Sequence, residues 1–398
     1  MSQSLNAVVT VLDPGTPGSG PLAGLRFGIK DNIGIAGVAS TCASAFFADR
    51  IAAADAEVVT RLRDAGASLV ATLNMAEFAM GVTSQNSVHG GVRNPWDLDR
   101  IPGGSSGGSG AAVAAGLVDV ALGTDTGGSV RIPASMNGVT GLRPTVGSVS
   151  DDGVFPVCLE ADVVGPLARS VGLVARTHAV LTGRPVAGVA SPSTVGVVTV
   201  PLAVDDGVAV RVDAAVRDLE SAGARLVPVT VPGFAEVRES LYTVVYADVA
   251  AQHRERILGE PERFQPDTLT RFRLGLDTTP AQRAAAMAEI GEFRRGLDAL
   301  FADVDVLLTP TVAVDVPLIG GDPDVLAVTR RVGELTAPWS AHLGPTLALP
   351  VGPHPGSGMP VGVQLTGPTG SEDLLFAAGA TFQRRTSWHE LRPPLHAA

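Results

Sequence analysis

Apolar and polar positions follow two periods in the first part of the chain. Residues 25–29 alternate with period two, which predicts a strand ending at Lys30. Residues 55–66 repeat apolar positions every three to four residues and end on glycine, which predicts a helix capped by Asp55. The apolar run at 68–73 predicts a buried strand. This strand–helix–strand order predicts an α/β fold whose sheet has parallel members and helices on its faces.

The same two periods predict the elements of the remaining chain. Further strands are predicted at 118–122, 195–200, 225–231, 304–308 and 361–365. Further helices are predicted at 74–81, 111–116, 208–223, 235–258, 280–302 and 371–385, the last one capped by Ser371. The block 232–303 is more helical and more charged than its surroundings, which indicates a peripheral helical layer.

Composition limits the classes of partner. The chain has 398 residues, of which 45% are hydrophobic and 17% charged, enough for a large core. A net charge of −11 argues against nucleic acid or an anionic membrane as partner. Cys42 and Cys158 do not form a disulfide scaffold, and neither a signal-peptide pattern nor an 18-residue apolar run is present. We therefore expect a cytoplasmic protein, and the histidine spacing predicts no metal site.

Two glycine-serine clusters dominate the segment 102–131. One covers 103–110 and the other 127–129, and an apolar stretch separates them. Glycine suits backbone that approaches a ligand closely, and serine adds hydroxyl groups there. A flexible linker is the alternative, but the apolar stretches AAVAAGL and VDVALG follow the first cluster and lead to the second, so the chain enters a core here.

Lys30 is the only lysine in the chain, and all other basic residues among the 29 Lys and Arg are arginines. Arginine stays protonated at working pH, whereas a buried lysine can lose its proton and act as a base. The alternative is a solvent-exposed lysine that survives by chance in an arginine-biased composition.

These residues permit serine-based nucleophilic catalysis. A serine hydroxyl needs a base to take its proton, and a second serine can relay that proton. The predicted arrangement is Ser129 as nucleophile, Ser105 as relay and Lys30 as base. Backbone amides can then stabilise the oxyanion of a tetrahedral intermediate. The predicted amide donors are those of Thr126, Gly127, Gly128 and Ser129.

Sequence blocks spread over nearly the whole chain resemble the amidase signature hydrolases. They are GIKDN (28–32), NMAEFAMG (74–81), RNPWD (93–97), PGGSSGGSGAAVAAG (102–116), GTDTGGSVRIPA (123–134), GLRPT (141–145), GPLAR (165–169), DVLLTP (305–310) and PVGVQL (360–365). The double-serine block is the most specific of them.

The resemblance implies a Ser-cisSer-Lys triad of Ser129, Ser105 and Lys30, with the cis peptide bond between Gly104 and Ser105. It also implies a single α/β/α domain over 1–398, built on a large twisted mixed sheet with helices on both faces. The region 232–303 would shape the pocket. Asp125 and Arg131 would fix loop geometry. The resemblance further implies a small-molecule amide substrate and no cofactor, and it leaves a homodimer open.

Four alternatives remain from the sequence. An α/β-hydrolase would use 103–107 as a G-x-S-x-G elbow, but 97–102 is charged and ends in proline where that elbow needs a strand. A non-catalytic phosphate-binding module would need a lysine after a glycine loop. The amidase subunit of an aminoacyl-tRNA amidotransferase and a hydrolase of urea- or carbamate-type substrates would keep the same site and change the role or the substrate.

Overall fold

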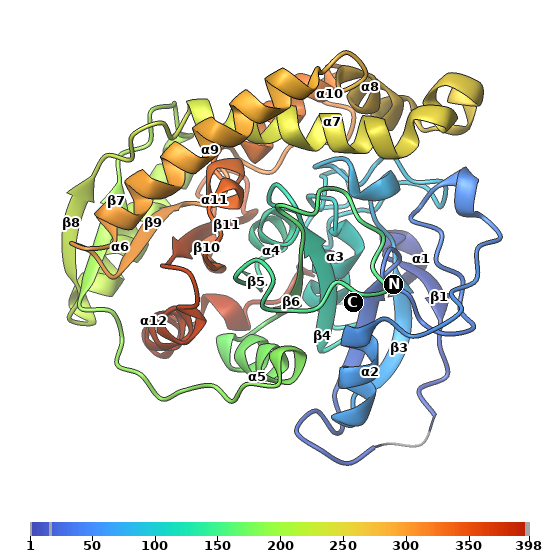
Figure 1. Cartoon of the computed structure of the whole chain (residues 1–398). Coiled ribbons are helices and arrows are strands. Elements are labelled where there is room, and N and C mark those ends of the chain that lie inside the picture. Colours follow the sequence, from blue (N-terminus) through green and yellow to red (C-terminus); the bar gives the residue numbers. More distant parts are fainter. Residues whose placement is uncertain (1, 16–17, 395–398) are drawn as a thin grey trace.

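One sheet of eleven strands forms the centre of the computed structural model, which describes residues 2–15 and 18–394 (Figure 1). Both ends of the predicted 1–398 domain therefore lie outside the described residues. The strand order is β1-β3-β2-β4-β6-β5-β10-β11-β9-β7-β8. The strands are β1 (Val8–Val11), β2 (Arg26–Lys30), β3 (Ser68–Leu73), β4 (Val120–Asp125), β5 (Thr140–Arg143), β6 (Val163–Ala168), β7 (Thr194–Val198), β8 (Arg225–Val229), β9 (Val306–Pro310), β10 (Thr346–Pro353) and β11 (Pro360–Thr366).

The sheet is mixed. β2 runs parallel to β3 and β4, and β7 runs parallel to β8 and β9, whereas the strands between these two groups pair antiparallel. The α-helices are α1 (Ser2–Leu5), α2 (Glu57–Asp64), α3 (Gly107–Ala114), α4 (Arg131–Asn137), α5 (Val171–Thr182), α6 (Asp206–Ser221), α7 (Glu236–Gly259), α8 (Pro266–Leu274), α9 (Pro280–Leu300), α10 (Val325–Gly333), α11 (Ala337–Ala341) and α12 (Glu372–Arg385).

Helices cover both faces of the sheet, and β4 shows why. Val120 and Leu122 point to one face, where they pack in a core with residues of α2, α5, α6 and α12. Ala121 points to the other face and packs against the alanines of α3. This alternation is the period-two pattern expected of a strand buried on both sides. The predicted α/β fold with a large mixed sheet is therefore confirmed.

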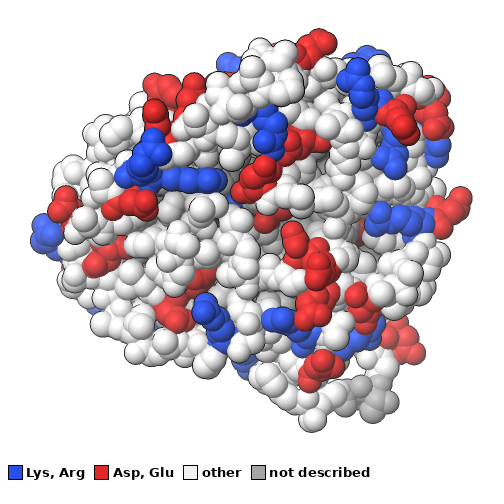
Figure 2. Space-filling model, viewed as in Figure 1, with Lys and Arg blue, Asp and Glu red and all other residues white. Residues whose placement is uncertain are grey.

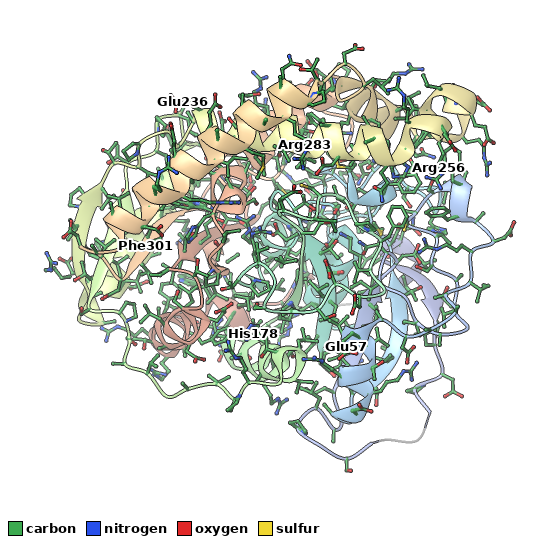
Figure 3. All side chains as sticks on the ribbon, viewed as in Figure 1. Glu57, His178, Glu236, Arg256, Arg283 and Phe301 are labelled. Atoms are coloured by element: carbon green, nitrogen blue, oxygen red, sulfur yellow. The ribbon has the colours of Figure 1, made fainter. Side chains whose placement is uncertain are left out.

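The long helices α7 and α9 lie against each other across one end of the sheet, with α8 beside them (Figure 1). Arg283 on α9, labelled in Figure 3, donates to Asp248 on α7 at 2.8 Å and to Glu160, in the loop before β6, at 2.6 Å. Cys158 lies in the same cluster, so three ligand-type atoms come within 4.8 Å of one another. The Arg283 guanidinium donates to both carboxylates, so this cluster contains two ion pairs. They connect the helical layer to the loop that leads into β6.

Three local predictions are wrong. The segment 74–81 is not a helix, since it holds only a 3₁₀ turn (Glu77–Ala79) in which Phe78 and Ala79 have φ of 50° and 59°. Asp55 does not cap α2, because its carboxylate accepts from the Ala36 amide and pairs with Arg63. Ser371 precedes α12 without a side-chain cap hydrogen bond. The turn backbone at 78–79 and the tertiary contacts of Asp55 override the local signal there, whereas the Ser371 hydroxyl has no partner among the described residues.

Acidic and basic side chains are interspersed over the face of the molecule shown in Figure 2, with uncharged surface between them. No helix among the described residues is long and apolar enough to cross a membrane.

Candidate active site

Lys30 is the last residue of β2, the middle strand of the parallel group β3-β2-β4. Its side chain is fully buried, at 0% exposure. The amine Nζ lies 2.8 Å from Ser105 Oγ and 2.7 Å from Thr124 Oγ1. The structure thus brings together two of the three residues predicted as a triad, 75 positions apart in the chain.

Burial lowers the pKa of Lys30 from its ordinary value of 10.5 to about 7, although the carboxylates of Asp125 and Asp162 partly oppose this shift. A large fraction of the amine is therefore neutral near pH 7, where an exposed lysine would be almost fully protonated.

Thr124 on β4 orients the amine and was not singled out from the sequence. It accepts from Lys30 Nζ, and its Oγ1 also accepts from Asn32 Nδ2 at 3.2 Å. A neutral amine has two N–H groups and one lone pair, so after donating one N–H to Thr124 it still has a lone pair with which to accept a proton from Ser105. The position of Thr124 in the block GTDTGGS, one strand away from Lys30, is the sequence signal that points to it.

Ser105 is held by its backbone. The peptide bond between Gly104 and Ser105 is cis, as the resemblance implies. The Ser105 carbonyl accepts from the Ala76 amide at 3.0 Å and from Ser84 Oγ at 3.3 Å. The irregular segment around residues 74–86 therefore fixes the serine whose hydroxyl contacts Lys30.

Ser129 lies in the turn between β4 and α4. Its carbonyl accepts from the Ser106 amide at 3.2 Å, so the two glycine-serine clusters are side by side. Its hydroxyl is half-buried, lines a cavity and has no hydrogen-bond partner among the described residues. A free hydroxyl open to a cavity is accessible to a ligand.

Asp125 organises the turn that carries Ser129. Its carboxylate accepts from Arg131 Nη2 at 2.9 Å, from the Gly128 amide at 2.8 Å and from the Val130 amide at 3.1 Å. Arg143 donates to it as well, and all three charged side chains have 0% exposure. Burial alone would raise the pKa of Asp125, but Arg131 and Arg143 outweigh it and hold that pKa far below its ordinary value.

One of the four amides predicted for the oxyanion hole points elsewhere, because the Gly128 amide donates to Asp125. Gly128 has φ of 131°, and a Cβ there would lie 2.2 Å from Thr336 Oγ1, so glycine is required for the turn rather than for donation. The amides of Thr126, Gly127 and Ser129 donate to no acceptor in the described part of the chain. They remain the candidate donors.

Ser129 shares its cavity with residues of the predicted peripheral layer. The cavity is small in this structure, with a volume of about 40 Å³. Its wall consists of Ala79, Met80, Gly81, Val82, Thr126, Gly127, Ser129, Ile132, Tyr242, Val245, Tyr246, Arg271 and Thr329. Tyr242 and Tyr246 stack with ring centroids 5.5 Å apart. Trp339 does not line this cavity: it is fully buried and donates to Thr309 Oγ1 at 3.1 Å.

Comparison with known proteins identifies the class. The amidase family model matches residues 12–376. The chain belongs to the amidase family and is an enzyme that acts on amide C–N bonds. The resemblance found in the sequence blocks is thereby confirmed, and the α/β-hydrolase alternative is excluded.

Individual relatives carry different names. The chain is 36% identical over 408 residues to a subunit of the glutamyl-tRNA(Gln) amidotransferase of Methanospirillum hungatei, covering 92% of this chain and 93% of the relative. It is 36% identical to AtzE, a 1-carboxybiuret hydrolase subunit of Pseudomonas sp. strain ADP, covering 91% and 84%. The solved structure of 6-aminohexanoate cyclic dimer hydrolase superimposes with a TM-score of 0.89 at 28% identity, covering 99% of this chain and 92% of that one.

Proposed function

We infer that this amidase hydrolyses a small carboxylic amide through an acyl-enzyme on Ser129. The observation that carries this inference is the contact between the fully buried amine of Lys30 and the hydroxyl of Ser105. A neutral amine beside a serine hydroxyl can act as a base, and the contacts of Lys30 with the described residues suggest no other role for it.

The proposed reaction proceeds in two steps. Neutral Lys30 takes a proton from Ser105 as Ser105 takes the proton of Ser129, whose oxygen attacks the amide carbon. The amides of Thr126, Gly127 and Ser129 would stabilise the oxyanion. Breakdown of the intermediate returns the proton through Ser105 to the leaving nitrogen. Water then hydrolyses the ester, activated by the same relay, and releases the acid.

Acyl trapping tests the assignment of the nucleophile. A fluorophosphonate probe should label wild-type protein on Ser129, identified by peptide mass spectrometry, and should fail to label Ser129→Ala. Ser106→Ala is the matched control, because Ser106 lies beside Ser129 and its hydroxyl donates to the Thr124 carbonyl instead. Label on Ser105 in the wild type would overturn the proposed roles.

The pH dependence of activity follows from Lys30. The base must be neutral, so kcat/KM is expected to fall as pH drops through about 7, the pKa of Lys30, and to level off above it. Rate measurements from pH 5.5 to 9 on one amide check this. A profile that stays flat across pH 7 would remove Lys30 as the base.

The variant Asp162→Asn tests whether the midpoint of that pH profile moves in the direction that the electrostatics predict. The Asp162 carboxylate stabilises the protonated form of Lys30, so its neutralisation should move the midpoint of the profile to lower pH. Asparagine retains an oxygen that can accept from Thr126 Oγ1, which donates to Asp162 at 2.5 Å. A midpoint that moves to higher pH would contradict the electrostatic assignment.

The role of an amidotransferase subunit is a second candidate, favoured by the 36% identity to a relative of that name. A urea- or carbamate-type substrate is favoured by the similarity to AtzE, the 1-carboxybiuret hydrolase subunit. Purified chain assayed alone for ammonia release from simple amides, glutamine and ureas separates these candidates from the free-standing amidase.

A further inference from the structure

The cavity beside Ser129 contains one formal charge. Among the described residues, Arg271 is the only charged side chain in the cavity wall, and none of those that line it is Asp or Glu. The other polar side-chain groups are hydroxyls, those of Ser129, Thr126, Thr329 and the two stacked tyrosines Tyr242 and Tyr246. A ligand in this cavity therefore meets a cation and hydroxyl donors but no anion.

Arg271 is buried without a counter-ion. It lies in the last turns of α8 with an exposure of 2%. Its Nη1 donates to the Asp267 carbonyl at 2.8 Å, and its Nη2 donates to Thr329 Oγ1 at 2.7 Å and to the Val325 carbonyl at 3.3 Å. Its Nε has no partner among the described residues, and the hydrogen bonds of its guanidinium go to two carbonyls and a hydroxyl rather than to a carboxylate. Burial of a cation without an anion is unfavourable, so such a group is expected to pair with an anionic ligand.

The other buried arginines show the contrast. Among the described residues, the fully or nearly buried arginines are Arg131, Arg143, Arg238 and Arg271. Arg131 and Arg143 share the carboxylate of Asp125, and Arg238 pairs with Glu239. Arg271 is the one of these four without a carboxylate, and it is the one that lines the cavity with the nucleophile.

The chain holds α8 firmly against this cavity. Glu77 accepts from the Gln265 amide at 2.8 Å, just before α8, and Asn86 donates to Thr268 at 3.0 Å. Both contacts come from the segment 74–86, whose residues 79–82 also line the cavity. The guanidinium is therefore positioned before a ligand arrives, which favours bidentate binding of a carboxylate.

We propose that Arg271 binds a carboxylate of the substrate and that the enzyme prefers amides that carry a carboxylate but no ammonium group, such as monoamides of dicarboxylic acids. This proposal rests on the proposed function in placing the amide carbon at Ser129. The described wall offers no carboxylate to pair with an α-ammonium group, and Arg271 would repel it, so glutamine and asparagine are expected to be poorer substrates than their deaminated counterparts.

Matched substrates separate the effect of the substrate carboxylate from the effect of its ammonium group. Succinamate, asparagine and butyramide differ only in the carboxylate and the ammonium group, as do glutaramate, glutamine and pentanamide. Of succinamate and glutaramate, the one that the wild type hydrolyses faster should have a kcat/KM roughly 100-fold higher than its neutral counterpart. Its kcat/KM should also be higher than that of its amino-acid counterpart. Equal or better turnover of the neutral amides, or of glutamine, would overturn the proposal.

The variant Arg271→Gln distinguishes substrate binding from a purely structural link between α8 and α10. It should lower kcat/KM roughly 100-fold more for the carboxylate amide than for the neutral amide. Arg273→Gln is the matched control, because Arg273 is exposed on the same helix two residues further on. Equal losses on both amides would mean that Arg271 acts only on the structure, and the proposal would be wrong.

A binding measurement keeps this proposal separate from the proposed function. Titration of succinate and glutarate into Ser129→Ala by calorimetry should show binding of at least one dicarboxylate, lost when Arg271→Gln is added. If this binding is found but no amide is hydrolysed by the wild type, the anion site stands and the proposed function fails. If amides are hydrolysed but neither dicarboxylate binds, the proposed function stands and the anion site fails.

Discussion

Lys30→Met is expected to lower kcat by about 10³-fold or more at pH 7. Methionine fills a similar apolar volume in a fully buried position but has no lone pair with which to accept the proton of Ser105. Lys30→Arg should be equally inactive, because arginine keeps its hydrogen bonds and stays protonated. Steady-state ammonia release, together with circular dichroism and thermal unfolding of each variant, measures this effect.

Arg26→Met serves as the control for that experiment. Arg26 begins the same strand, is exposed and pairs with Asp119 at the surface. Its replacement should leave kcat within about twofold and stability within about 1 kcal/mol. A folded Lys30→Met variant that retains more than about a tenth of wild-type activity would rule out Lys30 as the base.

Asp125→Asn is expected to destabilise the protein by about 3–5 kcal/mol at pH 7. The substitution leaves Arg131 and Arg143 buried beside each other without their shared carboxylate. The amide of the new side chain also replaces an acceptor of three backbone N–H bonds, from residues 128, 130 and 131. Urea unfolding at constant pH, extrapolated to water, measures the change in free energy.

The matched control is Asp119→Asn, which removes the carboxylate of a surface pair and should cost at most about 1 kcal/mol. The pKa of Asp125 is depressed in the folded protein, so its stabilising contribution is present above its unfolded pKa and is lost only as pH falls through the lower folded value. A similar, small loss for both variants would show that Asp125 does not hold the turn together.

The strands with clear period-two or apolar signals were predictable from local sequence. Residues 68–73 match β3 residue for residue, and the prediction for 361–365 falls inside β11. The strands β1, β5, β6 and β10 were not predicted as elements. The residues of β5, β6 and β10 are almost all buried, and these three strands contain glycine or proline at 141, 165, 166, 350, 352 and 353. Such strands lack alternation, and their pairing is decided by tertiary contacts.

The residues of the candidate site also divide into those that could be predicted from the sequence and those that could not. Lys30, Ser105, Asp125 and Arg131 were predictable because each residue type is tied to a chemical need within a specific sequence block. Arg271 and Asp162 were not, since neither stands in a motif and each matters only through distant neighbours. The single domain over 1–398 and the homodimer remain predictions.

The burial of Lys30 has a practical consequence. The chain has a single ε-amine, and it is inaccessible in the folded state. Acylating dyes and reductive methylation should therefore leave this side chain unmodified until the sheet around β2 opens. The rate at which the native protein gains one such label at residue 30 then reports the frequency of that opening, without any engineered probe.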